Sequence, residues 1–216
     1  MSTPPRSTPA QQGPPPNLAD LPTSAPQAGS WFREHAHRAG VDAGCWYYAP
    51  LPANPTLGGR FDLPAPEGTC YFANAAVVAA MERVGVFTAA HKPIPADIVE
   101  GRVVSEVPAS DLPATAGNLL ALVASTDFGV TGELFAMEDY SVPQAWARAS
   151  YAAGHAALVY TPRFSPFGQA IAVFGPQGAR PHPTTRATPL SEVLTQNHIT
   201  YERIPPVAEM TFHRVP

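Results

Sequence analysis

Apolar residues occur in short runs along the chain, and most of these runs predict β-strands. Gly68–Ala73 (GTCYFA) places a threonine and two aromatic residues in one short run, a composition typical of strands. Ala156–Tyr160 (AALVY) and Ala170–Phe174 (AIAVF) are continuous apolar runs, as expected of strands buried on both faces. Ile98–Val107 alternates well enough to predict another strand, and Ile199–Arg203 predicts a last one.

Two longer segments have the pattern of helices. The run from Asn74 to Gly85 (NAAVVAAMERVG) begins with a good N-cap residue and is apolar around most of its circumference, which predicts a buried helix that stops at the glycine. Val142–Gly154 has Pro143 in its first turn and Gly154 at its C-terminal end, and it predicts a second helix.

Three further segments complete the fold prediction. Trp31–Gly40 fits a strand end or a short helix, Leu119–Ala124 fits a strand or a buried helix, and Pro189–Thr195 fits a helix. No internal repeat is visible. Because the helices do not alternate regularly with the strands, we expect an α+β fold with a compact mixed sheet and few helices.

Composition divides the chain into a tail and one domain. Met1–Ser30 is built mainly from Pro, Ser, Thr, Gln and Ala, and it holds many of the 27 prolines. A segment with so little to bury is expected to be disordered or extended. The domain is then expected over residues 31–216, of which 176–216 form a C-terminal extension.

Charge and cysteine content narrow the function classes. The net charge is -4 and no Lys/Arg-rich run is present, which argues against a nucleic-acid partner. Neither a membrane helix nor a secretory signal is visible, so a cytoplasmic location is expected. Cys45 and Cys70 do not have the spacing of a zinc site and are expected to be buried thiols.

Several common enzyme signatures are missing. The sequence contains no GxGxxG opening a helix, no GxxxxGK[ST], no HExxH and no GxSxG. His35 and His37 could reach one metal ion from a strand, but no third ligand lies near them in the sequence. We therefore expect neither a metal nor a Rossmann-bound cofactor.

The segment GGRFDLPAPEGTCYFANAAVVAAMERVG holds the residues best suited to chemistry. It places Arg60 after two glycines, Tyr71 on a strand and Glu82 on the next helix. Arginine binds phosphate oxygens, tyrosine offers a flat face, and a carboxylate stabilises positive charge on a sugar carbon. In the last turn of a helix Glu82 would also be poorly matched to the helix dipole, which hints at a role other than stability. A purely structural alternative has Arg60 paired with Asp62, Tyr71 in the core and Glu82 solvated.

The same segment resembles the RES domain, a known protein family. GRFDLPAPEGTCYFA, followed by an alanine-rich helix with a glutamate, is the most specific part of the resemblance. The likeness extends from about Trp31 to Gly175 through WFRE (31–34), FGVTGEL (128–134), PQAWA (143–147), ALVYTPRF (157–164) and AIAVFG (170–175).

The resemblance implies an enzyme that breaks down NAD. RES domains are toxins of toxin–antitoxin systems whose partner is an Xre-type antitoxin, and their fold is similar to that of ADP-ribosyltransferases. NAD would be the substrate, with water or phosphate as acceptor and no other cofactor. The arginine and glutamate of the family fall on Arg60 and Glu82, and a pocket tyrosine falls on Tyr71. Secondary candidates for substrate contacts are Arg33, Tyr160 and Arg163.

The chain departs from the family pattern at its serine. Pro162 stands where the serine is expected, in the stretch Tyr160–Arg163, and proline supplies neither a hydroxyl nor an N–H. Thr161 or Ser165 could supply a hydroxyl, and Arg163 a phosphate contact. This departure leaves a non-catalytic NAD-binding or interaction module as an alternative. An ADP-ribosyltransferase is a further alternative, although Ala80 stands where arginine-directed transferases often have the first glutamate of a Glu-x-Glu pair.

Overall fold

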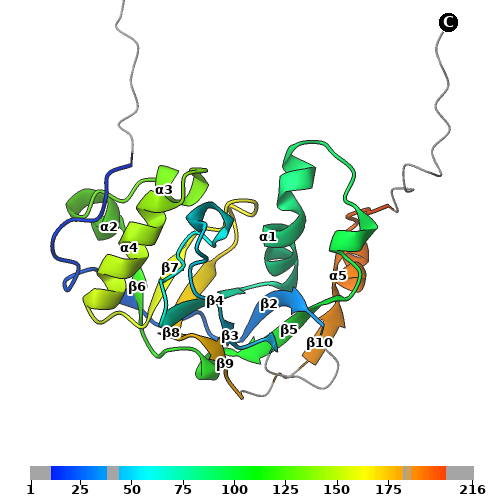
Figure 1. Ribbon diagram of the computed structural model, residues 1–216, viewed down its shortest axis with the longest axis horizontal. Coiled ribbons are helices and arrows are strands. Elements are labelled where there is room, and N and C mark those ends of the chain that lie inside the picture. Colours follow the sequence, from blue (N-terminus) through cyan, green and yellow to red (C-terminus); the bar gives the residue numbers. More distant parts are fainter. Residues whose placement is uncertain (1–10, 38–43, 182–183, 185, 203–216) are drawn as a thin grey trace, which may run out of the picture.

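The protein folds around one eight-stranded sheet (Figure 1). The computed structural model describes residues 11–37, 44–181, 184 and 186–202. Neighbouring strands are antiparallel except for the parallel pair β6–β7. In spatial order the strands are β1 (Thr23–Ser24), β6 (Ala116–Asn118), β7 (Ala157–Tyr160), β8 (Ala170–Pro176), β4 (Glu67–Ala73), β2 (Ser30–Ala36), β5 (Arg102–Pro108) and β10 (Arg186–Pro189). A small second sheet pairs β3 (Tyr47–Tyr48) with β9 (Gly178–Ala179).

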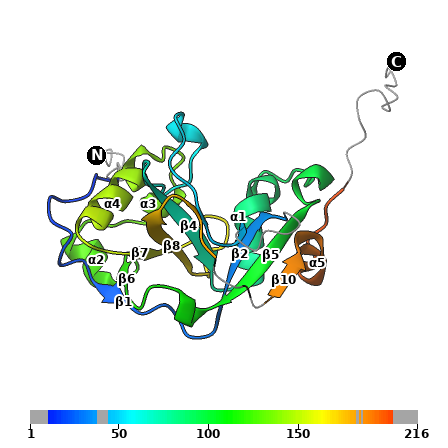
Figure 2. The ribbon, with the colours of Figure 1, turned by 60° about the horizontal axis from the view of Figure 1, so that its bottom comes forward.

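The helices form two separate groups along the sheet (Figures 1 and 2). α1 (Ala76–Ala89) packs with α5 (Leu190–Gln196) over β2 and β5, while α4 (Ser141–Ala152) packs with α3 (Glu133–Ala136) and covers β7. α2 (Leu122–Asp127) lies beside the second group, and short 3-10 turns occur at Pro55–Leu57, Ala96–Ile98 and Ala109–Asp111. The predicted α+β class, with a mixed sheet and few helices, is confirmed.

The sheet is weakly joined in its middle. β4 pairs with β8 over seven residues, but its pairing with β2 consists of the single pair Phe32 and Ala73. Two clusters of buried side chains follow this division, one around Trp146 under α4 and one around Val84 and Leu194 under α1 and α5. A third cluster, around Trp31 and Trp46, joins residues from both sides of it. The two helix groups therefore stand on either side of a seam between β2 and β4.

Most strand predictions are confirmed. β4, β7 and β8 lie where the apolar runs predicted them, and residues 30–36 form strand β2. β5 begins only at Arg102, because residues 96–98 form a 3-10 turn. The predicted strand Ile199–Arg203 is wrong for its described part, where Glu202 makes one isolated bridge with Pro95, while Arg203 lies outside the described residues.

The helix predicted from Asn74 to Gly85 is α1, and it extends further than predicted. It begins at Ala76, and Asn74 does not cap it, because the Asn74 side chain instead accepts a hydrogen bond from the Gln169 N–H (2.9 Å). The helix continues past Gly85 to Ala89. Gly85 serves close packing, since a Cβ there would lie 2.3 Å from Cγ of Phe164. Glu82 therefore lies in the middle of the helix, and the argument from the helix dipole does not apply.

The remaining helix predictions have clear outcomes. α4 confirms the prediction for Val142–Gly154, and Gly154 adopts a positive φ of 93° just after the helix. α5 confirms the prediction for Pro189–Thr195, and its buried Leu190 and Leu194 belong to the cluster under α1. In the ambiguous run Leu119–Ala124, the last three residues begin α2 and the first three form a turn before it. Among the described residues, no helix is long and apolar enough to cross a membrane.

The N-terminal segment corrects the prediction of a disordered tail. Within residues 11–30, Leu18 and Leu21 are each only 2% exposed, and β1 pairs with β6 at the edge of the sheet. The Leu18 carbonyl also lies 2.8 Å from Nε2 of His155. These partners are distant in the sequence, and for that reason composition alone did not reveal them. Residues 1–10 lie outside the described part.

We expect Leu21→Ala to destabilise the protein. The Leu21 side chain packs beside Gly117, where an added Cβ would lie 2.9 Å from Cδ2 of Leu21. Removing a buried leucine side chain costs about 2–5 kcal/mol, and this position at the sheet edge should fall near 2. Urea unfolding monitored by circular dichroism measures the change. An unchanged midpoint would show that the segment does not pack on the domain in solution.

Candidate functional site

A pocket of about 370 Å³ lies over the seam between β2 and β4. One wall is α1 and another is the segment before β4, while the floor is formed by strand residues. The lining consists of Phe32, Arg33, Glu34, Gly58, Gly59, Arg60, Tyr71, Phe72, Ala73, Ala79, Glu82, Arg83, Tyr140, Tyr160, Arg163, Phe164 and Ala170.

All of the predicted site residues line this one pocket. They are contributed by β2, the segment before β4, β4 itself, α1, the end of β7 and the β7–β8 connection: Arg33, Arg60, Tyr71, Glu82, Tyr160 and Arg163. The pocket lining therefore includes residues that are up to 130 positions apart in the sequence, Arg33 and Arg163 being the most distant.

Glu82 lines the α1 wall of the pocket. Its Oε1 accepts a long hydrogen bond from the Phe164 N–H at 3.5 Å. The residue as a whole is exposed, yet the protein around the carboxyl raises its pKa above the usual range. Burial of the carboxyl raises this pKa, whereas the Phe164 N–H, Arg60 and Arg163 lower it. Glu82 is thus a carboxylate that interacts electrostatically with Arg60 and Arg163 without forming an ion pair with either in the described part of the chain.

Arg60 is nearly buried, with 7% of its surface exposed. Its Nη1 donates to the carbonyls of Leu134 (3.2 Å) and Met137 (2.9 Å), and the guanidinium lies 4.5 Å from the centre of the Tyr140 ring. Burial lowers its pKa, and Tyr140, Tyr160 and Glu82 act in the opposite direction. The proposed ion pair with Asp62 does not form: Arg60 instead holds the segment after α3 against the pocket.

Asp62 fixes the orientation of Tyr71. The Tyr71 hydroxyl donates to Oδ1 of Asp62 (2.7 Å) and accepts from the Phe61 N–H (2.9 Å), while Asp62 also accepts from the Gly59 N–H (2.5 Å). A Cβ at Gly59 would lie 2.7 Å from the Tyr71 hydroxyl, so glycine is needed for this approach. The hydroxyl is thereby occupied, and Tyr71 lines the pocket chiefly with its ring.

We expect Tyr71→Phe to lower stability by about 1–3 kcal/mol, because the buried Asp62 carboxylate and the Phe61 N–H each lose a partner. The ring, which lines the pocket, would remain. Thermal unfolding compares this variant with Tyr151→Phe, which removes a hydroxyl from a partly exposed tyrosine of α4. Equal stability of the two variants would contradict a structural role for the Tyr71 hydroxyl.

Arg33 is held on the far side of its strand from the helices. Its Nη1 donates to the carbonyls of Cys45 (3.0 Å) and Tyr47 (2.9 Å) and contacts Sγ of Cys70. Cys45 and Cys70 are free and buried, as predicted, and burial raises the pKa of the two thiols to about 12 and about 11. The guanidinium of Arg33 therefore braces the segment around Cys45, although the residue contributes to the pocket lining.

Tyr160 ends β7, and Arg163 follows it in the β7–β8 connection. Arg163 pairs with the exposed Glu138 (3.1 Å), and its guanidinium is 5.3 Å from the centre of the Phe164 ring. Tyr160 is 4% exposed and packs edge-on against Phe61 with ring centres 4.8 Å apart. A surface ion pair such as that of Arg163 is weak and exchangeable.

Of the three residues that could replace the family serine, one lines the pocket and two do not. Pro162 is buried, and neither Thr161 nor Ser165 contributes to the pocket lining, whereas Arg163 does. The hydroxyl-bearing residues among the described lining are the tyrosines at positions 71, 140 and 160.

The pocket also contains residues that sequence reasoning missed. Tyr140 supports Arg60, Phe164 packs on Gly85, and Arg83 lies beside Glu82. Tyr140 precedes a predicted helix and Phe164 follows Arg163, but neither position carries a signal of its own. A charged residue such as Arg83 on a helix is ordinarily read as solvated.

The described residues contain no group of three or more His, Cys, Asp or Glu side chains suited to a metal ion. The His35 ring is engaged elsewhere, with Nε2 lying 2.8 Å from Oγ of Ser105 and Nδ1 lying 3.0 Å from the Ala36 carbonyl. The expectation that no metal takes part remains a prediction.

Comparison with known proteins identifies the fold and the family. The structure is similar to a chain of the crystal structure of the M. tuberculosis MbcT–MbcA toxin–antitoxin complex, with a TM-score of 0.59 and 19% sequence identity over 83% of this chain and 93% of that chain. No curated protein matches the sequence. The sequence model of the RES domain family matches residues 30–191 of this chain. This match extends beyond residues 31–175, where the resemblance was recognised in the sequence. The match covers most of the chain, which therefore belongs to the RES domain family.

Proposed function

We propose that this pocket cleaves the bond between nicotinamide and ribose in NAD. The observation that carries the proposal is the meeting of Arg60 from the loop before β4, Tyr71 from β4 and Glu82 from α1 in the lining of one pocket. A carboxylate beside cations and aromatic rings suits a substrate that combines a positively charged pyridinium ring, a ribose and a diphosphate.

In the proposed reaction the electrons of the C–N bond leave with nicotinamide, which becomes neutral. Positive charge then develops on the ribose, and Glu82 stabilises it as a fixed anion. Tyr71 packs its ring against the nicotinamide or the ribose. Arg60 contacts the substrate phosphates with nitrogens other than Nη1, whose hydrogen bonds hold the pocket wall. Orientation by these groups places the acceptor in line with the breaking bond.

The acceptor is water or phosphate. An oxygen of either one forms the new bond to the ribose carbon; water then releases one proton to solvent and gives ADP-ribose, whereas phosphate gives a phosphorylated ADP-ribose. Running the reaction in phosphate-free buffer and in added phosphate, and separating the products by mass, distinguishes the two. Intact NAD under both conditions, with folded protein, would contradict the proposed cleavage.

The raised pKa of Glu82 predicts the pH dependence of cleavage. The proposed mechanism needs the carboxylate, so kcat/KM should fall as the pH drops through the pKa of Glu82, and this limb should lie above the pH expected for an ordinary glutamate. Because the pKa is raised in the folded state, protonating this carboxyl favours folding, and activity should be lost before the protein unfolds. Measuring kcat/KM and circular dichroism in parallel from about pH 4, near the ordinary pKa of a glutamate, to about pH 8 checks the order. Simultaneous loss of both signals would contradict it.

We further propose that the protein acts as a toxin restrained by an antitoxin. Membership of the RES family and the likeness in fold to a chain from a toxin–antitoxin complex support this proposal. A cytoplasmic location and an Xre-type antitoxin are part of it. Induced expression in a bacterial host, with and without a neighbouring Xre-like gene, tests it: growth unaffected by either arrangement would argue against a toxin.

A second candidate function is NAD binding without turnover. Pro162 favours this candidate, because the position expected to hold serine has no hydroxyl and neither Thr161 nor Ser165 lines the pocket. Stabilisation of the protein by NAD without release of nicotinamide would support it. Incubating the protein with labelled NAD in a cell lysate distinguishes both candidates from an ADP-ribosyltransferase. Of the three, only a transferase would attach the label to protein.

A further inference from the structure

The arginines of the pocket differ in the hydrogen bonds and ion pairs that they make within the protein. Arg33 donates to two backbone carbonyls, Arg60 donates to two others, and Arg163 pairs with Glu138. Arg83 is exposed, and within the described part of the chain no hydrogen bond or ion pair engages its guanidinium. Arg83 is therefore the pocket arginine, among the described residues, whose donors are all free for a bound molecule.

The second carboxylate of the lining does not neutralise Arg83. Glu34 is bound by Arg102 through both oxygens: Nη2 of Arg102 donates to Oε2 at 3.0 Å, and Nε contacts Oε1. This two-pronged pair occupies the oxygens of Glu34. Positive charge at Arg83 thus stays available for an anionic group of the ligand.

The position of Arg83 relative to Glu82 suits one part of a dinucleotide. Ala79, Glu82 and Arg83 form the α1 wall, because residues three and four apart share one face of a helix. In NAD a single ribose separates the scissile bond from the diphosphate. A carboxylate at the ribose and a guanidinium at the neighbouring phosphate match that chemical order.

We propose that Arg83 binds the diphosphate of the substrate and makes the pocket selective for dinucleotides over nucleosides. This inference rests on the proposed function and adds a residue and a selectivity to it. The guanidinium forks onto phosphate oxygens, a contact that a substrate without phosphate does not make. Arg83 contributes equally before and during bond cleavage, so its effect falls on KM.

The test compares NAD with nicotinamide riboside, which has the same scissile bond and no phosphate. Arg83→Ala should lower the ratio of kcat/KM for NAD to that for nicotinamide riboside by about tenfold, as expected for loss of one charge-assisted hydrogen bond. Arg83→Lys, which keeps the charge, should restore part of the ratio. The matched control is Arg148→Ala on α4, which changes the net charge equally at an exposed position away from the pocket lining. An unchanged ratio in Arg83→Ala would overturn the proposal.

Binding of ADP-ribose, measured by calorimetry, separates this inference from the proposed function. About tenfold weaker binding to Arg83→Ala than to wild type supports the phosphate contact even if NAD is not cleaved. Equal binding, in a protein that does cleave NAD, overturns the role of Arg83 and leaves the proposed function standing. Absence of both binding and cleavage in the wild type overturns both.

Discussion

Glu82→Gln should lower kcat for NAD cleavage by about 10²–10³-fold, the usual loss when one fixed group that stabilises transition-state charge is removed. Glutamine keeps the shape of the side chain and its capacity to accept from the Phe164 N–H (3.5 Å). The substitution removes only the negative charge. Steady-state release of nicotinamide measures the effect.

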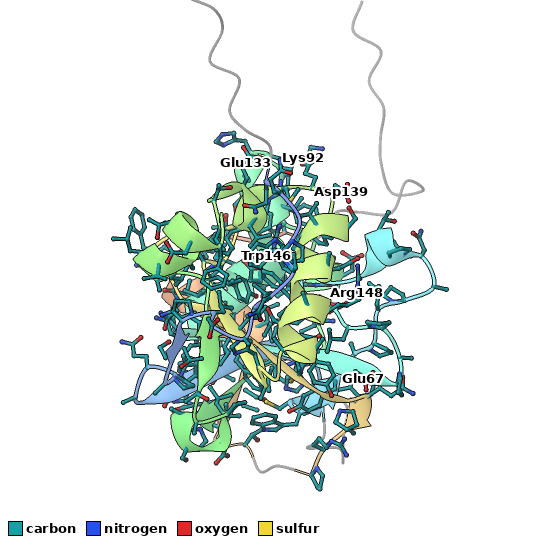
Figure 3. The ribbon with its side chains drawn as sticks, turned by 90° about the vertical axis from the view of Figure 1, so that its left-hand side faces the viewer. Glu67, Lys92, Glu133, Asp139, Trp146 and Arg148 are labelled. Carbon is teal, nitrogen blue, oxygen red and sulfur yellow. The ribbon has the colours of Figure 1, made fainter. Side chains whose placement is uncertain are left out.

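Stability separates this catalytic loss from misfolding. The pKa of Glu82 is raised chiefly by burial, so its charged form disfavours the folded state at neutral pH relative to a neutral side chain. Glu82→Gln should accordingly unfold at the same temperature as wild type or a higher one. Glu133→Gln, at an exposed position at the start of α3, is the matched control and should keep full activity (Figure 3). Full activity of Glu82→Gln would remove Glu82 from the mechanism.

Arg60→Ala should combine a large loss of stability with a loss of activity. The substitution removes two hydrogen bonds from a charged donor to the Leu134 and Met137 carbonyls, and the contact with Tyr140. We expect a cost of about 3 kcal/mol, since a hydrogen bond to a charged group contributes about 1.5–3 kcal/mol. The segment after α3 would lose its attachment, and KM for NAD would rise. Lysine, a single point charge, should rescue only part of this loss.

Denaturant unfolding and NAD kinetics at a temperature well below unfolding measure the two effects. Arg148→Ala is again the control, because Arg148 is exposed on the same helix as the buried Trp146 (Figure 3). An Arg60→Ala protein as stable as this control would contradict the bracing role. A stable variant with unchanged KM would also contradict the substrate contact.

Local patterns predicted much of the sheet. The strands β4, β7 and β8 are each an apolar run that is buried wherever it lies in the fold, so periodicity and composition suffice to find them. α4 carries its own boundary residues, Pro143 and Gly154. These elements can therefore be predicted from their own residues, without knowledge of the rest of the chain.

Contacts between distant segments account for the errors. The end of α1 was predicted at Gly85, but the glycine makes room for the Phe164 ring from the β7–β8 connection. The N-terminal segment is ordered against Gly117 and His155, which no local composition reveals. In each case tertiary packing overrides a local signal that is weak on its own.

The candidate site was predictable in part, and by resemblance more than by spacing. Arg60, Tyr71 and Glu82 belong to one contiguous segment of the resemblance, Arg33, Tyr160 and Arg163 belong to other parts of it, and all six line one pocket. The hydrogen-bond partners of these side chains were not predictable from the sequence. Those of Arg60, for example, are backbone carbonyls more than 70 residues away. The pocket position of Arg83 required the helix face to be known.

Release of nicotinamide from NAD by the purified wild-type protein is the most direct test of the proposed function. We expect steady release in the presence of either water alone or added phosphate, strongly reduced in Glu82→Gln and unaffected in Glu133→Gln. No release from the folded wild-type protein, under conditions in which NAD raises its unfolding temperature, would contradict catalysis and leave a protein that binds NAD without cleaving it.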